Sequence, residues 1–132
     1  MLRAFVVHWD AVELDAKIET VVAAGAHVVG AEHANGGRAL QAVKELKPDV
    51  LVVWLARRPG DGRVTAAAIR SYGWASELAV LFVEDPAEPL PKGSRAKLQE
   101  VLADALVVTP AMLAVWLSKV EKARLERSRP SP

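Results

Sequence analysis

The sequence predicts an α/β domain in which a parallel sheet is covered by helices on both faces. The clearest evidence is the unbroken apolar run at residues 50–55, which is expected of a strand buried on both sides. A second continuous apolar run covers residues 78–83. Strand-like and helix-like patterns alternate along the chain, which implies right-handed βαβ units and therefore parallel strands.

The first strand is expected at residues 2–7, because a short run rich in Val and Phe is followed at once by a helix-start signal. Asp10, with Glu13 three residues later, has the spacing of a capping box. Gly25 is expected just beyond the end of this helix, where a glycine commonly takes a left-handed conformation. Apolar residues at helical spacing mark its buried face: Leu14, Ile18, Val21 and Val22.

The middle of the chain continues the alternation. A second strand at residues 27–31 leads to Asn35, which can cap a second helix that ends at Pro48. The central strand follows, and Pro59-Gly-Asp-Gly62 is predicted to form the turn by which the chain leaves it. An Ala-rich third helix is expected at residues 63–72 and stops before the fourth strand.

The last third begins with a Pro-rich loop, Asp85-Pro-Ala-Glu-Pro-Leu-Pro-Lys-Gly93, which is longer and stiffer than the connection expected there. The remaining elements are a fourth helix at residues 94–102, a fifth strand at 105–108 and a final helix from 111 to about 124. The sequence therefore predicts one domain over residues 1–124, followed by a flexible basic tail at 125–132.

Composition narrows the function classes. The 132 residues are 52% hydrophobic and 25% charged, which indicates a globular domain. The absence of cysteine excludes disulfides, thiolate metal sites and a thiol nucleophile. No signal peptide is recognisable and no segment reaches the roughly 18 apolar residues of a membrane span, so we expect a cytoplasmic protein without membrane contact.

The charge pattern gives little reason to expect nucleic-acid binding, because the net charge is only +1. From Lys119 onward the chain carries five basic and two acidic residues, so this end has a charge of +3 and the remainder −2. A solvated tail is the simplest interpretation. A phosphate-contacting arm is the alternative.

Four short motifs occur in order along the chain: Ala34-Asn-Gly-Gly-Arg-Ala-Leu40, Pro48-Asp49, Pro59-Gly-Asp-Gly62 and Ala103-Asp-Ala-Leu-Val-Val-Thr-Pro110. In this order and spacing the sequence resembles the response-regulator receiver family over residues 2–122. The resemblance implies a flavodoxin-like, three-layer domain with five helices and a five-stranded parallel sheet in the order 2-1-3-4-5.

The positions that carry phosphoryl chemistry in that family are all changed. In the register of the resemblance, the Mg²⁺-binding acid pair falls on His8 and Trp9, and the phospho-accepting Asp on Trp54. The hydroxyl position is Val83 and the Lys position is Thr109. An indole cannot accept a phosphoryl group, and without the carboxylates no oxygen cage for Mg²⁺ remains. The chain thus resembles the degenerate, pseudo-receiver subset, which acts through protein contact or dimerisation.

Trp9 and Trp54 are predicted to lie close together at the C-terminal edge of the sheet, where open α/β sheets place their ligand sites. The favoured interpretation is that the two indoles fill the former acidic pocket. The alternative is an aromatic ligand cleft with a polar rim made by His8, Arg57, Arg58, Glu84 and Asp85.

His8, Glu84 and Asp85 are candidate metal ligands, since all three follow neighbouring strands. Their spacing matches no metal motif, and a lone His at a strand end is usually only hydrogen-bonded. We therefore predict neither a metal nor a cofactor.

The last helix carries the best interaction signal. Leu113, Trp116, Leu117 and Val120 form a core-facing stripe, but Ala111, Met112 and Val115 are apolar as well and lie partly outside it. In the receiver family this region commonly forms the dimer surface. The resemblance therefore implies a homodimer through the last helix and the fifth strand, with Met112, Val115 and Trp116 as interface candidates.

The predicted function is a non-enzymatic, phosphorylation-independent receiver-like module that acts in signalling by dimerisation or protein binding. The alternative is a flavodoxin-like protein that binds a small molecule or nucleotide at the C-terminal edge of the sheet. A nucleic-acid role through the basic tail is a third, weaker possibility.

Overall fold

The computed structural model describes residues 1–102, 104 and 106–128. Over these residues the chain forms a five-stranded parallel sheet in the order β2-β1-β3-β4-β5, as predicted. The strands are β1 (Arg3–Val7), β2 (His27–Glu32), β3 (Val50–Trp54), β4 (Ala79–Val83) and β5 (Leu106–Val108). The helices are α1 (Leu14–Ala23), α2 (Gly36–Leu46), α3 (Pro59–Arg70), α4 (Ser94–Val101) and α5 (Leu113–Arg127), with short 3-10 helices η1 (Gly73–Ala75) and η2 (Pro110–Met112).

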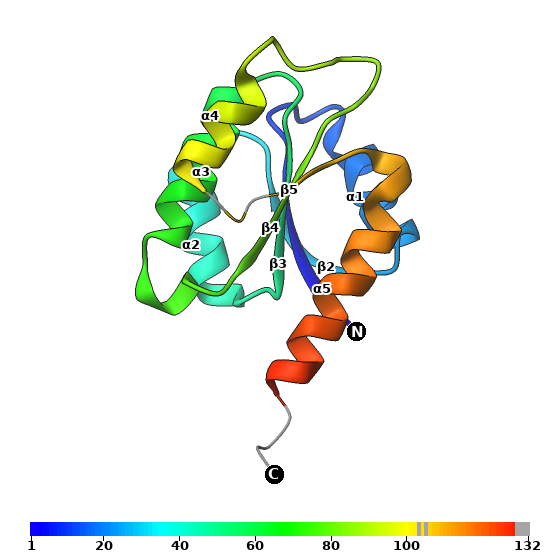
Figure 1. Ribbon diagram of the computed structural model, residues 1–132, viewed down its shortest axis with the longest axis vertical. Coiled ribbons are helices and arrows are strands. Elements are labelled where there is room, and N and C mark those ends of the chain that lie inside the picture. Colours follow the sequence, from blue (N-terminus) through cyan, green and yellow to red (C-terminus); the bar gives the residue numbers. More distant parts are fainter. Residues whose placement is uncertain (103, 105, 129–132) are drawn as a thin grey trace.

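Two layers of helices enclose the sheet (Figure 1). Helices α2, α3 and α4 cover one face, and α1 and α5 cover the other. Successive strand residues point to opposite faces, so Leu51 and Val53 enter the core under α2 and α3, whereas Val50, Val52 and Trp54 enter the core under α1 and α5. This burial on both sides explains why the sequences of β3 and β4 are continuous apolar runs.

Local capping signals in the first half of the chain are confirmed. Gly25 has φ +107°, and the Ala26 N–H bonds to the Val21 carbonyl at 3.4 Å, which is the Schellman pattern. Asn35 is the N-cap of α2, where its side-chain oxygen accepts from the Arg38 N–H at 3.1 Å. Gly25 thus ends α1 and Asn35 begins α2, as the sequence predicted.

The predicted capping box is only half formed, and it closes the turn before α1, whose N-cap residue is Glu13. The Asp10 carboxylate accepts from the N–H groups of Val12 at 2.9 Å and Glu13 at 3.1 Å. The Glu13 side chain does not return to the Asp10 N–H, which bonds instead to the His8 carbonyl at 2.9 Å. Glu13 is left free for contacts at the edge of the sheet.

The prediction that Pro59-Gly-Asp-Gly62 is a turn was wrong, because α3 begins at Pro59. Proline suits the first position of a helix, where its fixed φ is already helical and its missing N–H needs no partner. The reversal of the chain takes place earlier, at Arg57, whose φ is +77°. Asp61 therefore lies in the first turn of α3, where a carboxylate interacts favourably with the helix dipole.

The last helix differs from its predicted range, 111 to about 124. Helix α5 begins at Leu113 and continues to Arg127, three residues past that predicted end. Residues 129–132 of the predicted tail, and Ala103 and Ala105 of the fourth motif, lie outside the described residues. No helix in the described part of the chain is both long and apolar enough to cross a membrane.

Candidate functional site at the C-terminal edge of the sheet

The C-terminal ends of β1, β3 and β4 meet at the edge where the sequence placed the site. Trp54, the last residue of β3, is 1% exposed and packs with the apolar side chains under α1 and α5. The Lys17 ammonium lies 5.7 Å from the centroid of its ring, within the range of a cation–π interaction. Its indole N–H has no hydrogen-bond partner among the described residues. Trp54 is therefore a core side chain.

Trp9 also lies at this edge but packs on the opposite face, in the core under α2 and α3. A Cβ added to Gly62 would lie 2.9 Å from Val53 Cγ1 and 3.6 Å from the Trp9 indole nitrogen, so the first turn of α3 packs closely over Trp9. The prediction that Trp9 and Trp54 fill or line one shared pocket was wrong. The two indoles belong to separate cores on the two faces of the sheet.

Strand register explains this separation. Val7 pairs with Val53, so the next residues along the two strands, His8 and Trp54, follow on the same side of the sheet. Trp9 is one residue further on and shares its face with Phe5 and Val7. An offset of one residue is enough to send a side chain to the other face.

His8, at one of the two positions that the resemblance assigned to the acid pair, is fully buried. Its Nε2 lies 2.9 Å from a carboxylate oxygen of Glu13, and its Nδ1 has no partner among the described residues. The contact joins the end of β1 to the start of α1. His8 therefore serves as a buried anchor for Glu13.

Arg57 completes this network from the loop after β3. Its Nε donates to Glu13 Oε1 at 3.1 Å and its Nη2 to Oε2 at 2.6 Å, which is the bidentate geometry of a strong Arg–carboxylate pair. The same guanidinium lies 3.8 Å from Asp10 and 3.9 Å from Glu88. One cation thus joins the loops that follow β1, β3 and β4.

The network fixes its own charges. Hydrogen bonds from Arg57, and then from His8, lower the pKa of Glu13 to about 2. The Glu13 carboxylate in turn raises the pKa of Arg57. The carboxylate is therefore ionised at neutral pH and already bound to a cation of the chain. The sequence suggested Glu13 only as a helix cap, and it gave no sign that Arg57, 44 positions later, would reach it.

Glu84 and Asp85 hold the Pro-rich loop. Glu84 pairs with Arg95 and accepts from the Leu90 N–H at 2.8 Å, and these two contacts, the first being the larger, lower its pKa. Asp85 accepts from the Ala87 N–H at 2.9 Å. Both carboxylates thus already have partners within the chain. Among the described residues no three His, Asp or Glu side chains lie close enough together to hold a metal ion.

Arg58, the remaining rim residue, lies apart from these groups. Its guanidinium is 3.6 Å from Asp61, and it borders a cavity of about 190 Å³ together with Trp9 and Thr65. The predicted rim is therefore not a single ring around one cleft: Arg57 belongs to the Glu13 network, Arg58 to this small cavity, and the two acids to the loop.

Solved structures of signalling proteins share this architecture. The signal receiver domain of a modulated diguanylate cyclase from Desulfovibrio desulfuricans G20 is 18% identical, with a TM-score of 0.71 over 96% of this chain and 98% of that one. The chemotaxis protein CheY4 of Vibrio cholerae is 19% identical, with a TM-score of 0.70 over 91% and 98%. A LuxR-family response regulator from Aurantimonas sp. SI85-9A1 is 21% identical, with a TM-score of 0.68 over 98% and 88%.

This chain has the receiver fold. Identities of this size establish the fold alone, and no protein-family model or curated protein matches the sequence.

Two further positions are those that the resemblance assigned to the hydroxyl and the Lys of a receiver. Val83, in the predicted hydroxyl position, is fully buried in the core under α1 and α5. Thr109, in the predicted Lys position, precedes η2 and makes no side-chain capping hydrogen bond. Val83 has no hydroxyl and Thr109 has no ammonium, so neither side chain offers the group that its position would need to contact a phosphoryl group.

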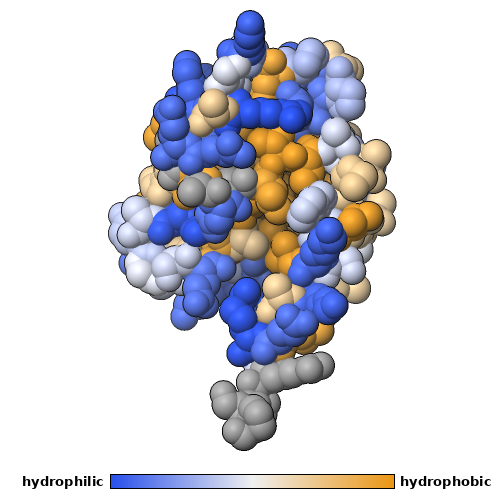
Figure 2. Space-filling model, viewed as in Figure 1, coloured by the Kyte–Doolittle hydropathy of each residue, from blue (hydrophilic) through white to orange (hydrophobic). Residues whose placement is uncertain are grey.

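The surface of this receiver fold beside β5 is apolar. Figure 2 shows hydrophobic atoms gathered between α4 and α5, over the edge of the sheet that β5 forms. Met112 of η2 is 45% exposed, Val115 of α5 is 47% exposed, and Leu106 of β5 is 38% exposed. Trp116 is half-buried against the core, with the Lys119 ammonium 4.4 Å from its ring centroid. The predicted interface residues therefore divide into two exposed side chains and one that is partly core.

Proposed function

We propose that this chain is a pseudo-receiver, a non-enzymatic module that acts in signalling or regulation through protein contact and without phosphorylation. The observation that carries the proposal is Trp54, which stands in the register of the phospho-accepting Asp and is buried in the core. An indole offers no oxygen nucleophile for phosphoryl transfer. The usual chemical input of a receiver has no acceptor here.

The Glu13–Arg57 network supports the same proposal from the side of the metal. Mg²⁺ binds hard oxygen ligands, usually one or two carboxylates with water. At this edge the carboxylate of Glu13 is already bound to a guanidinium and to His8. A divalent cation would have to displace Arg57, whose charge repels it.

The output of such a module is contact with another protein, and we propose a homodimer through β5 and α5. Leu106, Met112 and Val115 expose apolar side chains on this surface. Contiguous exposed apolar patches on soluble domains commonly mark interaction sites. Trp116, the next residue of α5 after Val115, is already fixed by the core and by Lys119, so little side-chain entropy is lost when a partner covers it.

The alternative, a small-molecule or nucleotide site at the C-terminal edge, receives less support. The cavity there measures about 190 Å³, whereas ligand pockets usually enclose roughly 300 to 1,000 Å³. Trp9 borders it but Trp54 does not, so the aromatic cleft on which this alternative depended is not formed.

The proposal is tested by incubating the protein with Mg²⁺ and a small phosphodonor, and then measuring the intact mass. We expect no increment of a phosphate. A receiver domain that retains its Asp, treated in parallel, shows that the donor is active. A phosphoryl adduct on any Asp of this chain would overturn the proposal.

A further inference from the structure

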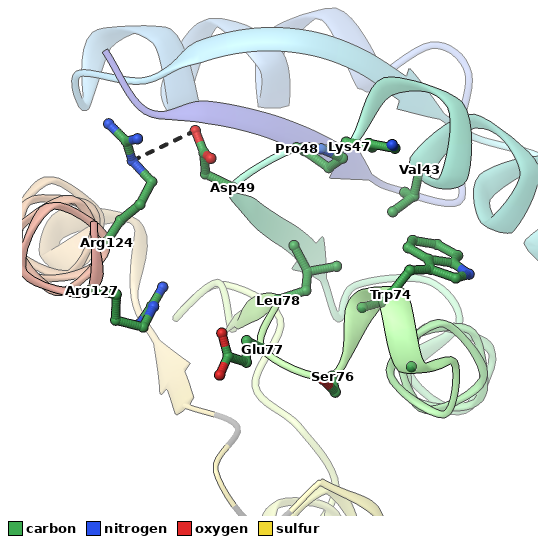
Figure 3. A pocket seen from close by; sticks show the side chains of 12 residues that line it. Val43, Lys47, Pro48, Asp49, Trp74, Ser76, Glu77, Leu78, Arg124 and Arg127 are labelled. Carbon is green, nitrogen blue, oxygen red and sulfur yellow. Dashed lines mark ion pairs between the residues drawn. The ribbon is translucent and has the colours of Figure 1, made fainter. Parts of the chain in front are cut away.

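A groove of about 390 Å³ opens at the opposite, N-terminal edge of the sheet, and the predicted site does not include it. Figure 3 shows that it lies between the end of α2, the segment that follows α3 and the end of α5. Its volume falls in the range of small-molecule sites, unlike the cavity at the C-terminal edge. Its polar and aromatic lining residues include Lys47, Trp74, Ser76, Glu77, Arg124 and Arg127.

An exposed aromatic side chain forms one end of the groove. Trp74 is 42% exposed, and its ring stacks on Tyr72 with the ring centroids 5.9 Å apart and the planes at 29°. In Figure 3 it lies at the end near Val43, away from the two arginines. Tyr72 thus packs against the indole, and the rest of the Trp74 side chain is exposed to a planar ligand ring.

Two arginines form the other end, and their roles differ. Arg124 binds Glu121 at 2.9 Å and lies 3.9 Å from Asp49, and these carboxylates fix its guanidinium. Arg127, one helical turn further on, lines the groove and takes part in no ion pair with another described residue. Of these two arginines, Arg127 is the one available to a ligand.

The end of α2 does not cancel this positive charge. The carbonyl end of α2 would repel an anion, but Arg3 donates to the Leu46 carbonyl at 2.7 Å and to the Lys47 carbonyl at 2.9 Å. Lys47 itself also makes no ion pair with a described residue, and of the groove's acids only Glu77 is similarly uncommitted. The groove's charged groups without an ion-pair partner among the described residues are therefore Arg127, Lys47 and Glu77. Together they have a net positive charge, and the Glu77 carboxylate is a hydrogen-bond acceptor.

We propose that this groove binds a mononucleotide, with the base stacked on Trp74, the phosphate on Arg127 and a ribose hydroxyl donating to Glu77. A planar ring, an anion and a hydroxyl are the three features that the lining calls for. Guanidinium suits a phosphate because it can donate two parallel hydrogen bonds. The site is separate from the degenerate phosphorylation positions, so it does not depend on the proposed pseudo-receiver function.

The test is a titration of the ¹⁵N-labelled protein with AMP, followed by the indole N–H signals of its four tryptophans. We expect the Trp74 signal to shift while those of Trp9 and Trp54 stay in place. Adenosine, which lacks the phosphate, should bind at least about tenfold more weakly, because a hydrogen bond to a charged group is lost. Inorganic phosphate alone should leave the Trp74 signal unchanged.

Variants locate the site. Arg127→Gln should weaken AMP binding by roughly tenfold. Arg38→Gln, an exposed arginine of α2 outside the groove, should leave binding unchanged and serves as the matched control. Trp74→Ala should weaken it by at least about fivefold through lost stacking. Trp74→Phe keeps a ring and should retain most of the affinity, and it remains informative if the alanine variant does not fold.

The proposal is overturned if AMP produces no shift at millimolar concentration, or if Arg127→Gln and Arg38→Gln bind it equally. A shift of Trp9 without one of Trp74 would also overturn it, because the ligand would then occupy the opposite edge of the sheet.

Discussion

The Arg57 guanidinium donates hydrogen bonds to both carboxylate oxygens of Glu13, at 3.1 Å and 2.6 Å, across the C-terminal edge of the sheet. Glu13 stands at the start of α1 and Arg57 in the loop after β3. The pair therefore ties together two connections that in a receiver fold border the phosphorylation site. It places a cation of the chain itself at the edge where a working receiver binds Mg²⁺.

The first prediction concerns the charge of Glu13. Replacing Arg57 by Gln removes the largest cause of the low Glu13 pKa, so this pKa should rise from about 2 towards its ordinary value. The bond to His8 remains and should keep it somewhat depressed. NMR titration of the side-chain carboxyl carbons measures the change. Arg58→Gln is the control, because Arg58 contacts Asp61 and should leave the Glu13 titration unaltered.

The second prediction is the pH dependence that follows. A carboxylate whose pKa is about 2 in the folded state and 4.5 in the unfolded state binds fewer protons when folded. Its contribution is therefore complete above pH 4.5 and is lost as the pH falls towards 2. Glu13→Gln should melt at a lower temperature than the wild type at pH 7, and the difference should shrink as the pH falls through this window.

Thermal unfolding at a series of pH values measures that difference. Glu19→Gln, on the exposed side of α1, supplies the matched control and should melt with the wild type throughout. A gap between Glu13→Gln and wild type that stays constant from pH 5 to pH 2 would contradict the assigned pKa.

The third prediction concerns Trp54 as a core residue. Trp54→Ala should lower the free energy of unfolding by about 3–5 kcal/mol, because it leaves a cavity in the core under α1 and α5. Urea denaturation measures the loss. Trp74→Ala removes the same side chain from a position that is 42% exposed and should cost much less. Similar losses at both positions would show that Trp54 is not the core side chain described here.

Much of this fold follows from local patterns in the sequence. The buried strands were predicted because a strand covered on both sides must be apolar at every position, as in β3. Gly25 and Asn35 were predicted because each satisfies a helix end through its own backbone or side chain. Such signals depend on neighbouring residues only.

The candidate site was predicted less well, since its geometry depends on pairing between distant segments. The faces on which Trp9 and Trp54 lie depend on the register of β1 against β3, which a single sequence does not contain. The Glu13–Arg57 pair also joins residues far apart in the chain. Pro59 was ambiguous even locally, because a proline followed by glycine suits a turn as well as the first turn of a helix.

The fourth prediction concerns the apolar surface beside β5. If the chain dimerises there, Met112→Glu and Val115→Glu should each convert a dimer into a monomer, because a charge would have to be buried in an apolar contact. Both positions are exposed, so the fold itself should survive. Val64→Glu introduces the same charge at an exposed position on α3, in the helix layer on the other face of the sheet, and should leave the dimer intact. Light scattering after size-exclusion chromatography gives the mass of each variant. This surface would be ruled out as the interface if the wild type is a monomer at high protein concentration. It would also be ruled out if both Met112→Glu and Val115→Glu remain dimers.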